Sequence, residues 1–363
     1  MRFVPASCLR AGMRIAKNLH GINSEKLLAE GVVLNFTLIN SIKRLSFPGV
    51  YIDDDLSKDI EIINTISDEL RIETMQGIKK IFVEANVHKD PRERTEDVSR
   101  QVDSIVDELV ANKNMMVNMI DLKCFDNYTY LHSVNVAVLA IVTGIAMGLD
   151  RVTLWRLGLS AILHDIGKVF IDKKIVNKPG VLTDEEFHLM KRHSLLGYTY
   201  AKEKFRLPGS SYNGIIDHHE KFDGTGYPKG KSGTAVSLFG RIITVADVYD
   251  ALTSERPYRK ALSPSEAMEY IMGNSASMFD PQISGVFIRK VAPYPVGTTV
   301  KLSNGCTAIV LENFESFCLR PRVRVYKIND RDVTPFELNL MDDFSLLNVV
   351  VEDVANEENN LIS

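Results

Sequence analysis

The first part of the chain carries short apolar runs of the kind found in strands. MRIAKNL and KLLAEGVVL mix apolar and polar residues over a few positions each, which is typical of β-structure. One stretch with helical spacing, FTLINSIKRL, follows them, and FPGVYIDDD comes next. We therefore predict a small β-rich domain over residues 1–56, and we interpret it as regulatory.

Two helical patterns follow over residues 57–122. In the first, apolar residues recur at helical spacing from Ile60 to Phe82. Pro91 interrupts this pattern, and a second helix is expected from about Glu96 to Leu122, with a heptad-like apolar seam. A seam this short more often packs within its own subunit, but it leaves open a homodimer formed through this helical linker.

Residues 123–292 read almost entirely as helix. The run VAVLAIVTGIAMGL is too short to span a bilayer, so we interpret it as a buried helix and expect no membrane partner. Thr183 and Glu186 have the spacing of a capping box, and Ser263-Pro264 is typical of a helix start.

Alternation replaces helical spacing over residues 293–363. Asn304-Gly305 lies between two strand-like runs there and indicates a hairpin. We predict a short β-rich C-terminal extension. The fold class is therefore mainly α, with a helical bundle flanked by β-rich ends.

Composition narrows the classes of partner. The net charge of −4 with 25% charged residues argues against a nucleic-acid-binding surface. The four cysteines show no paired metal-ligand spacing, and the chain does not open with a secretory pattern. We expect a cytoplasmic protein with free thiols.

Candidate chemistry gathers in the helical segment, which holds six of the eight histidines. Asp250 is an alternative to Asp247, but Asp247 lies on the more apolar side of its predicted helix. The predicted ligands are His132, His164, Asp165, His193, His218, His219 and Asp247. This set is too large for one tetrahedral zinc and suits two octahedral ions that share a bridge. A carboxylate can bind one metal with each oxygen, so Asp165 is the natural bridge, and phosphoester hydrolysis is the chemistry that such a centre suits.

The segment HHEKFDGTGYP places His218 and His219 side by side. Neighbouring side chains on a helix diverge by about 100°, so the two rings cannot share one flat helix face. They can share a point target, such as a metal ion, where a helix loosens at its end. Taken alone, the pair is more often two solvated histidines ahead of a turn.

Three motifs in order resemble the HD-GYP family of bacterial cyclic di-GMP phosphodiesterases: HDIGK, HHEKFDGTGYP and RIITVADVYDALTSERPYR. The resemblance covers about residues 124–290. It implies hydrolysis of cyclic di-GMP to pGpG by a hydroxide that bridges two metals, with onward hydrolysis to GMP left open. The metals implied are iron, with manganese next.

The resemblance also assigns roles to single residues. Both adjacent histidines become metal ligands, while Gly224, Gly226 and Tyr227 shape the pocket beside them. Lys168 joins Asp165 as a catalytic residue, placed to stabilise phosphate oxygens or the leaving group. A lysine that only caps its helix is the alternative. Two arginines in SERPYRK are matched to phosphate contacts: Arg256 and Arg259.

One position departs from the family pattern. Members with a third metal have a glutamate one turn before the first histidine, where this chain has Tyr128. A binuclear centre is therefore preferred. Two other functions stay open: a weakly active cyclic di-GMP sensor, and a hydrolase of another cyclic dinucleotide.

Overall fold

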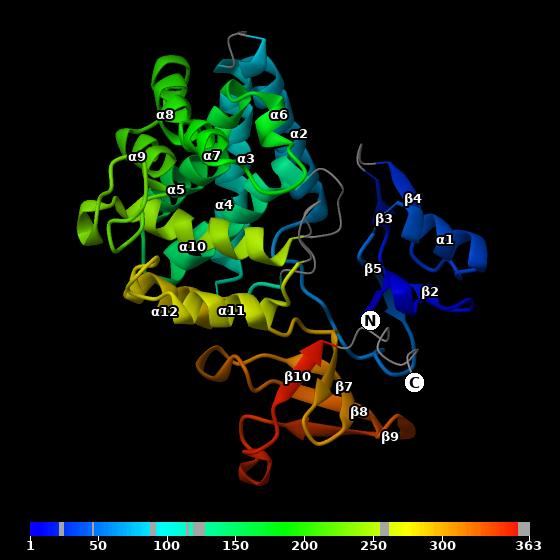
Figure 1. The fold of residues 1–363 in the computed structure, drawn as a ribbon. Coiled ribbons are helices and arrows are strands. Elements are labelled where there is room, and N and C mark those ends of the chain that lie inside the picture. The colour runs from blue at the N-terminus through cyan, green and yellow to red at the C-terminus, as the bar shows by residue number, and fades with distance from the viewer. Residues whose placement is uncertain are drawn as a thin grey trace. The chain divides into compact units, whose positions relative to one another are not determined.

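The computed structural model describes residues 1–21, 25–45, 47–87, 92–113, 116–118, 128–254 and 261–354. Contacts divide the chain into two compact units. One comprises residues 1–64, 116–127 and 291–363, and the other comprises residues 65–115 and 128–290. The first is β-rich and the second is helical, which confirms the predicted mainly α fold class with small β regions (Figure 1). The segment limits predicted along the chain stay a prediction.

The N-terminal part of the first unit holds two small antiparallel sheets and one helix. β1 (Arg2–Pro5), β5 (Gly49–Asp53) and β2 (Arg14–Ile15) form the larger sheet in that order. β3 (Leu19–His20) pairs with β4 (Lys26–Leu28), and α1 (Phe36–Arg44) lies between β4 and β5 in the chain. The buried side of α1 packs Ile39 and Ile42 into the apolar core of this part.

The C-terminal part of the same unit is a five-stranded antiparallel sheet of order β10-β6-β7-β8-β9. Its strands are β6 (Thr299–Leu302), β7 (Cys306–Glu312), β8 (Arg322–Ile328), β9 (Arg331–Asn339) and β10 (Val351–Val354). The predicted hairpin joins β6 to β7, and Gly305 takes the left-handed conformation (φ +80°) that its turn requires.

The two β-rich ends of the chain pack together. Ile60 and Ile62 join Tyr51 and Ile309 in one buried apolar cluster. The Arg324 guanidinium donates to both carboxylate oxygens of Asp59, each at 2.6 Å. Residues far apart in the sequence therefore build one unit.

The helix predicted from residue 57 onward begins only at Asp68, so the prediction was wrong for residues 57–67. α2 spans Asp68–Asn86. The apolar residues ahead of it serve the β-rich cluster instead of a helix face. Ser67 precedes α2, and its backbone N–H and hydroxyl donate to the Glu108 carboxylate at 2.7 and 2.8 Å. That anchor, together with acidic residues in the first turn, fixes the start of the helix.

The second predicted helix is α3 (Arg92–Ala111), so its predicted end near Leu122 was wrong: residues 116–118 are not helical, and Val117 forms a β-bridge with Val291. The part of the heptad-like seam that lies on α3 is buried. Val98 and Val102 are at most 1% exposed. A Cβ built on Gly77 of α2 would meet Val98, and one built on Gly158 would meet Val102. The seam therefore packs against helices of its own subunit, which is the alternative weighed beside dimerisation.

The remaining helices form a bundle around α4 (Tyr128–Ala146), which contacts α2, α3, α5, α10 and α12 (Figure 1). Their bounds are α5 (Arg151–Leu163), η2 (Ile166–Phe170), α6 (Lys173–Val176), α7 (Asp184–Lys191), α8 (His193–Lys204), α9 (Gly209–Asp217), η3 (Gly233–Ala235), α10 (Leu238–Thr253), α11 (Pro264–Gly273) and α12 (Pro281–Lys290). The predicted capping box is present at Thr183, and the helix start predicted at Ser263 is closed by a second capping box. Among helices of the described segments, none has the length and apolarity to cross a bilayer.

Candidate metal centre

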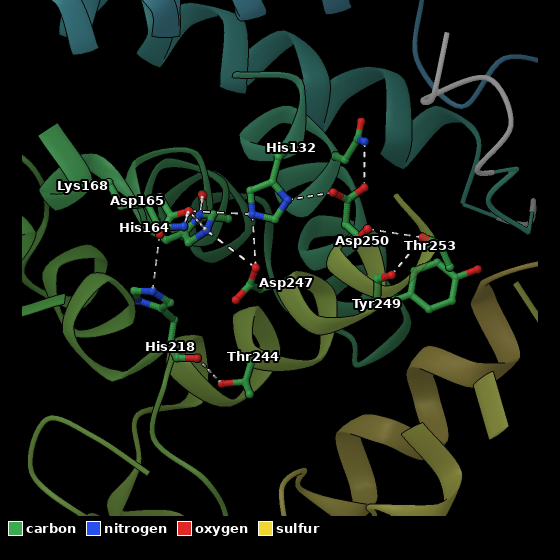
Figure 2. A network of polar contacts seen from close by, with 12 residues as sticks. His132, His164, Asp165, Lys168, His218, Thr244, Asp247, Tyr249, Asp250 and Thr253 are labelled. Carbon is green, nitrogen blue, oxygen red and sulfur yellow. Dashed lines mark hydrogen bonds and ion pairs between the residues drawn. The ribbon is translucent and has the colours of Figure 1, made fainter. Parts of the chain in front are cut away.

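Five helical elements converge on one buried cluster of imidazoles and carboxylates (Figure 2). His132 comes from α4, and Asp247 comes from α10. The others lie at helix ends: His164 and Asp165 follow α5, His193 begins α8, and His218 and His219 follow α9. The structure thus brings together all seven side chains that the sequence singled out.

Helix ends position three of the histidine rings in the same way. His164, His193 and His218 each place Nδ1 on the backbone carbonyl oxygen three residues earlier, at 2.6, 2.7 and 2.7 Å. A carbonyl oxygen can only accept, so Nδ1 carries the proton and donates it. When such a ring is neutral, its lone pair lies on Nε2, which faces the cluster. Such a partner on the far nitrogen is the usual device that orients a metal-binding histidine.

His132 uses a carboxylate for the same purpose. Its Nδ1 lies 2.7 Å from Asp250 Oδ2, and its Nε2 lies 3.1 Å from Asp247 Oδ1. Asn135 donates to the other oxygen of Asp250 at 2.8 Å. The two aspartates of α10 are therefore distinct, since Asp247 faces the cluster while Asp250 holds His132 from behind (Figure 2).

The Asp165 carboxylate stands between two sets of imidazole nitrogens. Oδ2 lies 3.3 Å from Nε2 of His164 and 3.8 Å from that of His132. Oδ1 lies 3.5 Å from Nε2 of His193 and 3.9 Å from that of His218. The donor atoms form two overlapping groups that share Asp165: one with His132 and His164, the other with His193, His218 and His219.

Two atoms of this cluster show that its donors fit a cation. Among the described residues, Asp165 Oδ1 and His164 Nε2 have no hydrogen-bond partner, although both are buried. An unsatisfied buried acceptor costs about 1–3 kcal/mol. A carboxylate oxygen beside several acceptor nitrogens can be satisfied by a metal ion, and nitrogen with oxygen donors suits a divalent transition metal.

Burial and neighbouring charges keep His193, His219 and Asp165 in the protonation states that metal binding needs. Burial lowers the pKa of His193 to about 4 and that of His219 to about 3, so both rings are neutral at neutral pH. Burial alone would raise the pKa of Asp165, but Lys168 beside it holds that pKa well below its usual range.

His132 is the exception. Burial acts to lower its pKa, yet the hydrogen bonds to Asp247 and Asp250 outweigh burial and raise it to about 9. A cation held by His132 Nε2 and Asp247 would take the place of that proton, because metal ligands bind in their deprotonated form.

Comparison with known proteins identifies the domain that carries this cluster. A family model described as HD domain matches residues 114–283. Residues 114–283 of this chain therefore form an HD domain. The recognition of an HD-GYP-type protein from its motifs is confirmed.

A cyclic di-GMP phosphodiesterase of Pseudomonas aeruginosa is 38% identical over 248 residues, which cover 68% of this chain and 59% of that protein. A 3'3'-cGAMP-specific phosphodiesterase 1 of Vibrio cholerae is 35% identical over 195 residues, which cover 52% of this chain and 43% of that protein. The chain thus matches less than two thirds of the length of these relatives. A solved structure of Bd1817, an HDG"Y"P protein from Bdellovibrio bacteriovorus, aligns with a TM-score of 0.49 at 19% identity, over 79% of this chain and 97% of that one.

Gly167 allows the turn that follows Asp165 to pack closely against α8. Helix α5 ends at Leu163, and Gly167 lies inside η2. A Cβ on Gly167 would collide with the carbonyl oxygen of His193 and the backbone of Gly197. Glycine is needed here because it lets η2 approach α8 directly, which brings Asp165 to His193.

Lys168 reaches the cluster from the same 3-10 turn. Its Nζ donates to Asp165 Oδ2 at 2.5 Å, and its side chain is 31% exposed. The lysine therefore pairs with the shared carboxylate, rather than lying free at a helix end.

The loop of residues 223–228, called the GYP loop below, packs over the histidine pair of the HD domain. The Tyr227 ring stacks on His219, with ring centroids 4.7 Å apart and an angle of 29° between planes. A Cβ on Gly226 would collide with the backbone of residues 219–221, and Gly224 has a φ of +86°. Both glycines are therefore required by the fold of the loop.

Two buried acidic residues that the sequence reasoning missed hold this loop. Glu220 accepts from the backbone N–H groups of Lys229 and Lys231 at 2.7 and 3.0 Å. Asp217 accepts from Lys231 Nζ with both oxygens, at 2.7 and 2.8 Å. The only sequence signal for them was an acidic residue on each side of the histidine pair.

Three residues named from the sequence lie outside what the structure describes. They are Arg256 and Arg259, together with the side chain of Tyr128.

Proposed function

We propose that this HD domain hydrolyses a phosphodiester bond of cyclic di-GMP and releases the linear dinucleotide pGpG. The observation that carries the proposal is the Asp165 carboxylate, whose two oxygens face different sets of imidazole nitrogens. A shared carboxylate between two donor sets is the arrangement used by two-metal phosphoesterases. The name of the Pseudomonas aeruginosa relative supports the choice of substrate.

The proposed cofactors are two divalent ions, with iron first and manganese next. We propose that His132, His164 and Asp247 hold one ion, that His193, His218 and His219 hold the other, and that Asp165 serves both. When bound, such ions lower the pKa of water and neutralise the charge of the phosphodiester.

The protein's own groups then act on the substrate. We propose that Lys168, whose side chain is 31% exposed beside the buried Asp165, contacts phosphate oxygens or the leaving group as charge develops there. Tyr227 and the loop glycines shape the pocket beside His219. Arg256 and Arg259 keep the phosphate-binding role that the family resemblance implies. A homodimer through the helical linker would need a surface other than the buried seam.

The test combines metal analysis with turnover on one anaerobic preparation. We expect about two ions per chain and conversion of cyclic di-GMP to pGpG. Asp165→Ala should lose metal and turnover while its circular dichroism stays that of the wild type. Asp184→Ala, an exposed aspartate on α7, is the matched control and should change none of these.

Several outcomes would contradict the proposal. One zinc ion per chain with no further binding would overturn the two-metal arrangement, and a near-normal rate in folded Asp165→Ala would overturn the bridging role. Binding of cyclic di-GMP without turnover would leave a sensor instead of an enzyme.

A mixed cyclic dinucleotide is the second candidate substrate, because the Vibrio cholerae relative is named a 3'3'-cGAMP-specific phosphodiesterase. Rates measured for cyclic di-GMP and 3'3'-cGAMP side by side decide between the two substrates.

A further inference from the structure

The metal centre reaches the protein surface on the side of Tyr227. His193 and His218 are almost fully buried, whereas His219 and Tyr227 are only partly buried. Since the Tyr227 ring stacks on His219, it is the first group outside the ligand set on this side. A substrate too large for the buried cluster would therefore extend past Tyr227.

Helix α7 supplies two side chains beside Tyr227. The Phe187 ring lies edge-on to the Tyr227 ring, with centroids 6.5 Å apart and an angle of 84°. Lys191 Nζ lies 4.6 Å from the centroid of Phe187 and 5.8 Å from that of Tyr227. Phe187 and Lys191 are four positions apart, so both project from one face of α7.

Phe187 is more exposed, and Lys191 less paired, than side chains that serve only to pack the surface. Phe187 is 45% exposed, so its ring keeps a large apolar face in water. No carboxylate within the described ranges pairs with Lys191, whereas Lys178 pairs with Glu186 and Lys231 pairs with Asp217. The cation thus lies over exposed aromatic rings with its charge available to an anion.

Helix α7 holds these side chains on a fixed base. Its first turn is closed by the Thr183–Glu186 capping box, and Lys178 bonds to the same Glu186 carboxylate at 2.5 Å. The helix ends at Lys191, and α8 begins with the ligand His193. Phe187 and Lys191 therefore keep a fixed position relative to the metal centre.

We propose that Phe187, Lys191 and Tyr227 form a nucleotide subsite at the mouth of the metal centre. This proposal rests on the proposed function. One nucleobase of the cyclic dinucleotide packs against the two aromatic rings, and Lys191 faces a phosphate. A cyclic dinucleotide carries two phosphates and two bases. When one phosphate occupies the centre, a base and the other phosphate must lie outside it, against aromatic and cationic groups.

The kinetic test uses two substrates. Phe187→Ala and Lys191→Met should each raise the KM for cyclic di-GMP by roughly tenfold, the usual loss when one stacking or cationic contact is removed, with kcat within about twofold. Hydrolysis of bis(p-nitrophenyl) phosphate, a diester without nucleobases, should stay within about twofold, because it needs only the centre. Metal content is measured on every sample.

Two matched controls accompany these variants. Leu189→Ala removes another exposed apolar side chain of α7. Lys202→Met removes a lysine that also lies over an aromatic ring, 5.6 Å from the centroid of Tyr198, near the far end of α8. Both controls should resemble the wild type with both substrates.

A binding measurement separates the subsite from catalysis. Calorimetry with GMP should show weaker binding by roughly tenfold in both variants, while inorganic phosphate should bind Phe187→Ala as it binds the wild type. If wild-type protein cleaves the nitrophenyl ester but not cyclic di-GMP, the proposed substrate fails, and GMP binding still tests the subsite.

Two results would overturn the subsite. One is a KM for cyclic di-GMP and a GMP affinity that stay unchanged in both variants. The other is an equal loss on both substrates, which would show that the changes act on the centre itself.

Discussion

Replacing Asp250 with alanine tests whether the hydrogen-bond partner behind His132 controls metal binding. Asp250 is fully buried and touches His132 Nδ1 at 2.7 Å, but it does not face the cluster. The substitution should leave His132 in place while removing the group that orients its ring and raises its basicity. Asp250 is thus a positioning residue rather than a ligand.

The expected magnitude has two parts. Loss of an outer partner of a metal-binding histidine typically weakens metal affinity by about 10- to 100-fold, which is about 1.4–2.8 kcal/mol of binding free energy. The buried donors of His132 and Asn135 also lose their acceptor, at about 1–3 kcal/mol of folding stability each. The metal affinity and the melting temperature should therefore both fall.

Asp250→Asn separates orientation from charge. The new amide oxygen can still accept from His132 Nδ1. Asn135 Oδ1 has no partner within the described chain, so its amide can turn to accept from the new NH₂ group. Both hydrogen bonds are kept while the negative charge is lost. This variant should melt close to the wild type and lose less metal affinity than the alanine variant.

The assay is a competition titration with a chromophoric chelator, run beside thermal melting. Asp280→Ala is the control, because Asp280 is buried, pairs with Arg241 and caps α12, yet contacts none of the predicted ligands. It should lower the melting temperature and spare metal affinity. A metal dissociation constant within about twofold of wild type in Asp250→Ala would refute the reasoning.

Three further substitutions test other parts of the centre. Lys168→Ala should keep its metal and lower kcat by ~10²–10³; a kcat within about twofold at full metal occupancy would remove the lysine from catalysis. Gly167→Ala should destabilise the fold by about 1–3 kcal/mol, since its Cβ would collide with the His193 carbonyl; unchanged urea denaturation would contradict this contact. Lys231→Met leaves the buried Asp217 carboxylate without its cation, and we expect a loss of about 1–3 kcal/mol, whereas equal melting curves would show that the pair contributes nothing.

Local patterns were enough to identify several of the elements and the types of ligand. Capping boxes at Thr183 and Ser263 depend on residues three positions apart, so their signal is complete in the sequence. The Asn304-Gly305 hairpin is likewise local. The seven candidate ligands could be named because imidazoles and carboxylates are rare on apolar helical faces.

Contacts between distant segments could not be read in this way. The sequence favoured Asp247 over Asp250, one turn away on the same helix, but only the packing of α10 against α4 shows that Asp250 contacts His132 from behind. Likewise, the pairing of Asp59 with Arg324 and the approach of Gly167 to His193 join segments that no local period connects. The sequence by itself determined which groups were available for metal binding. The tertiary structure decided which nitrogen and which oxygen of each group point inward, because that choice depends on the partner that occupies the other side.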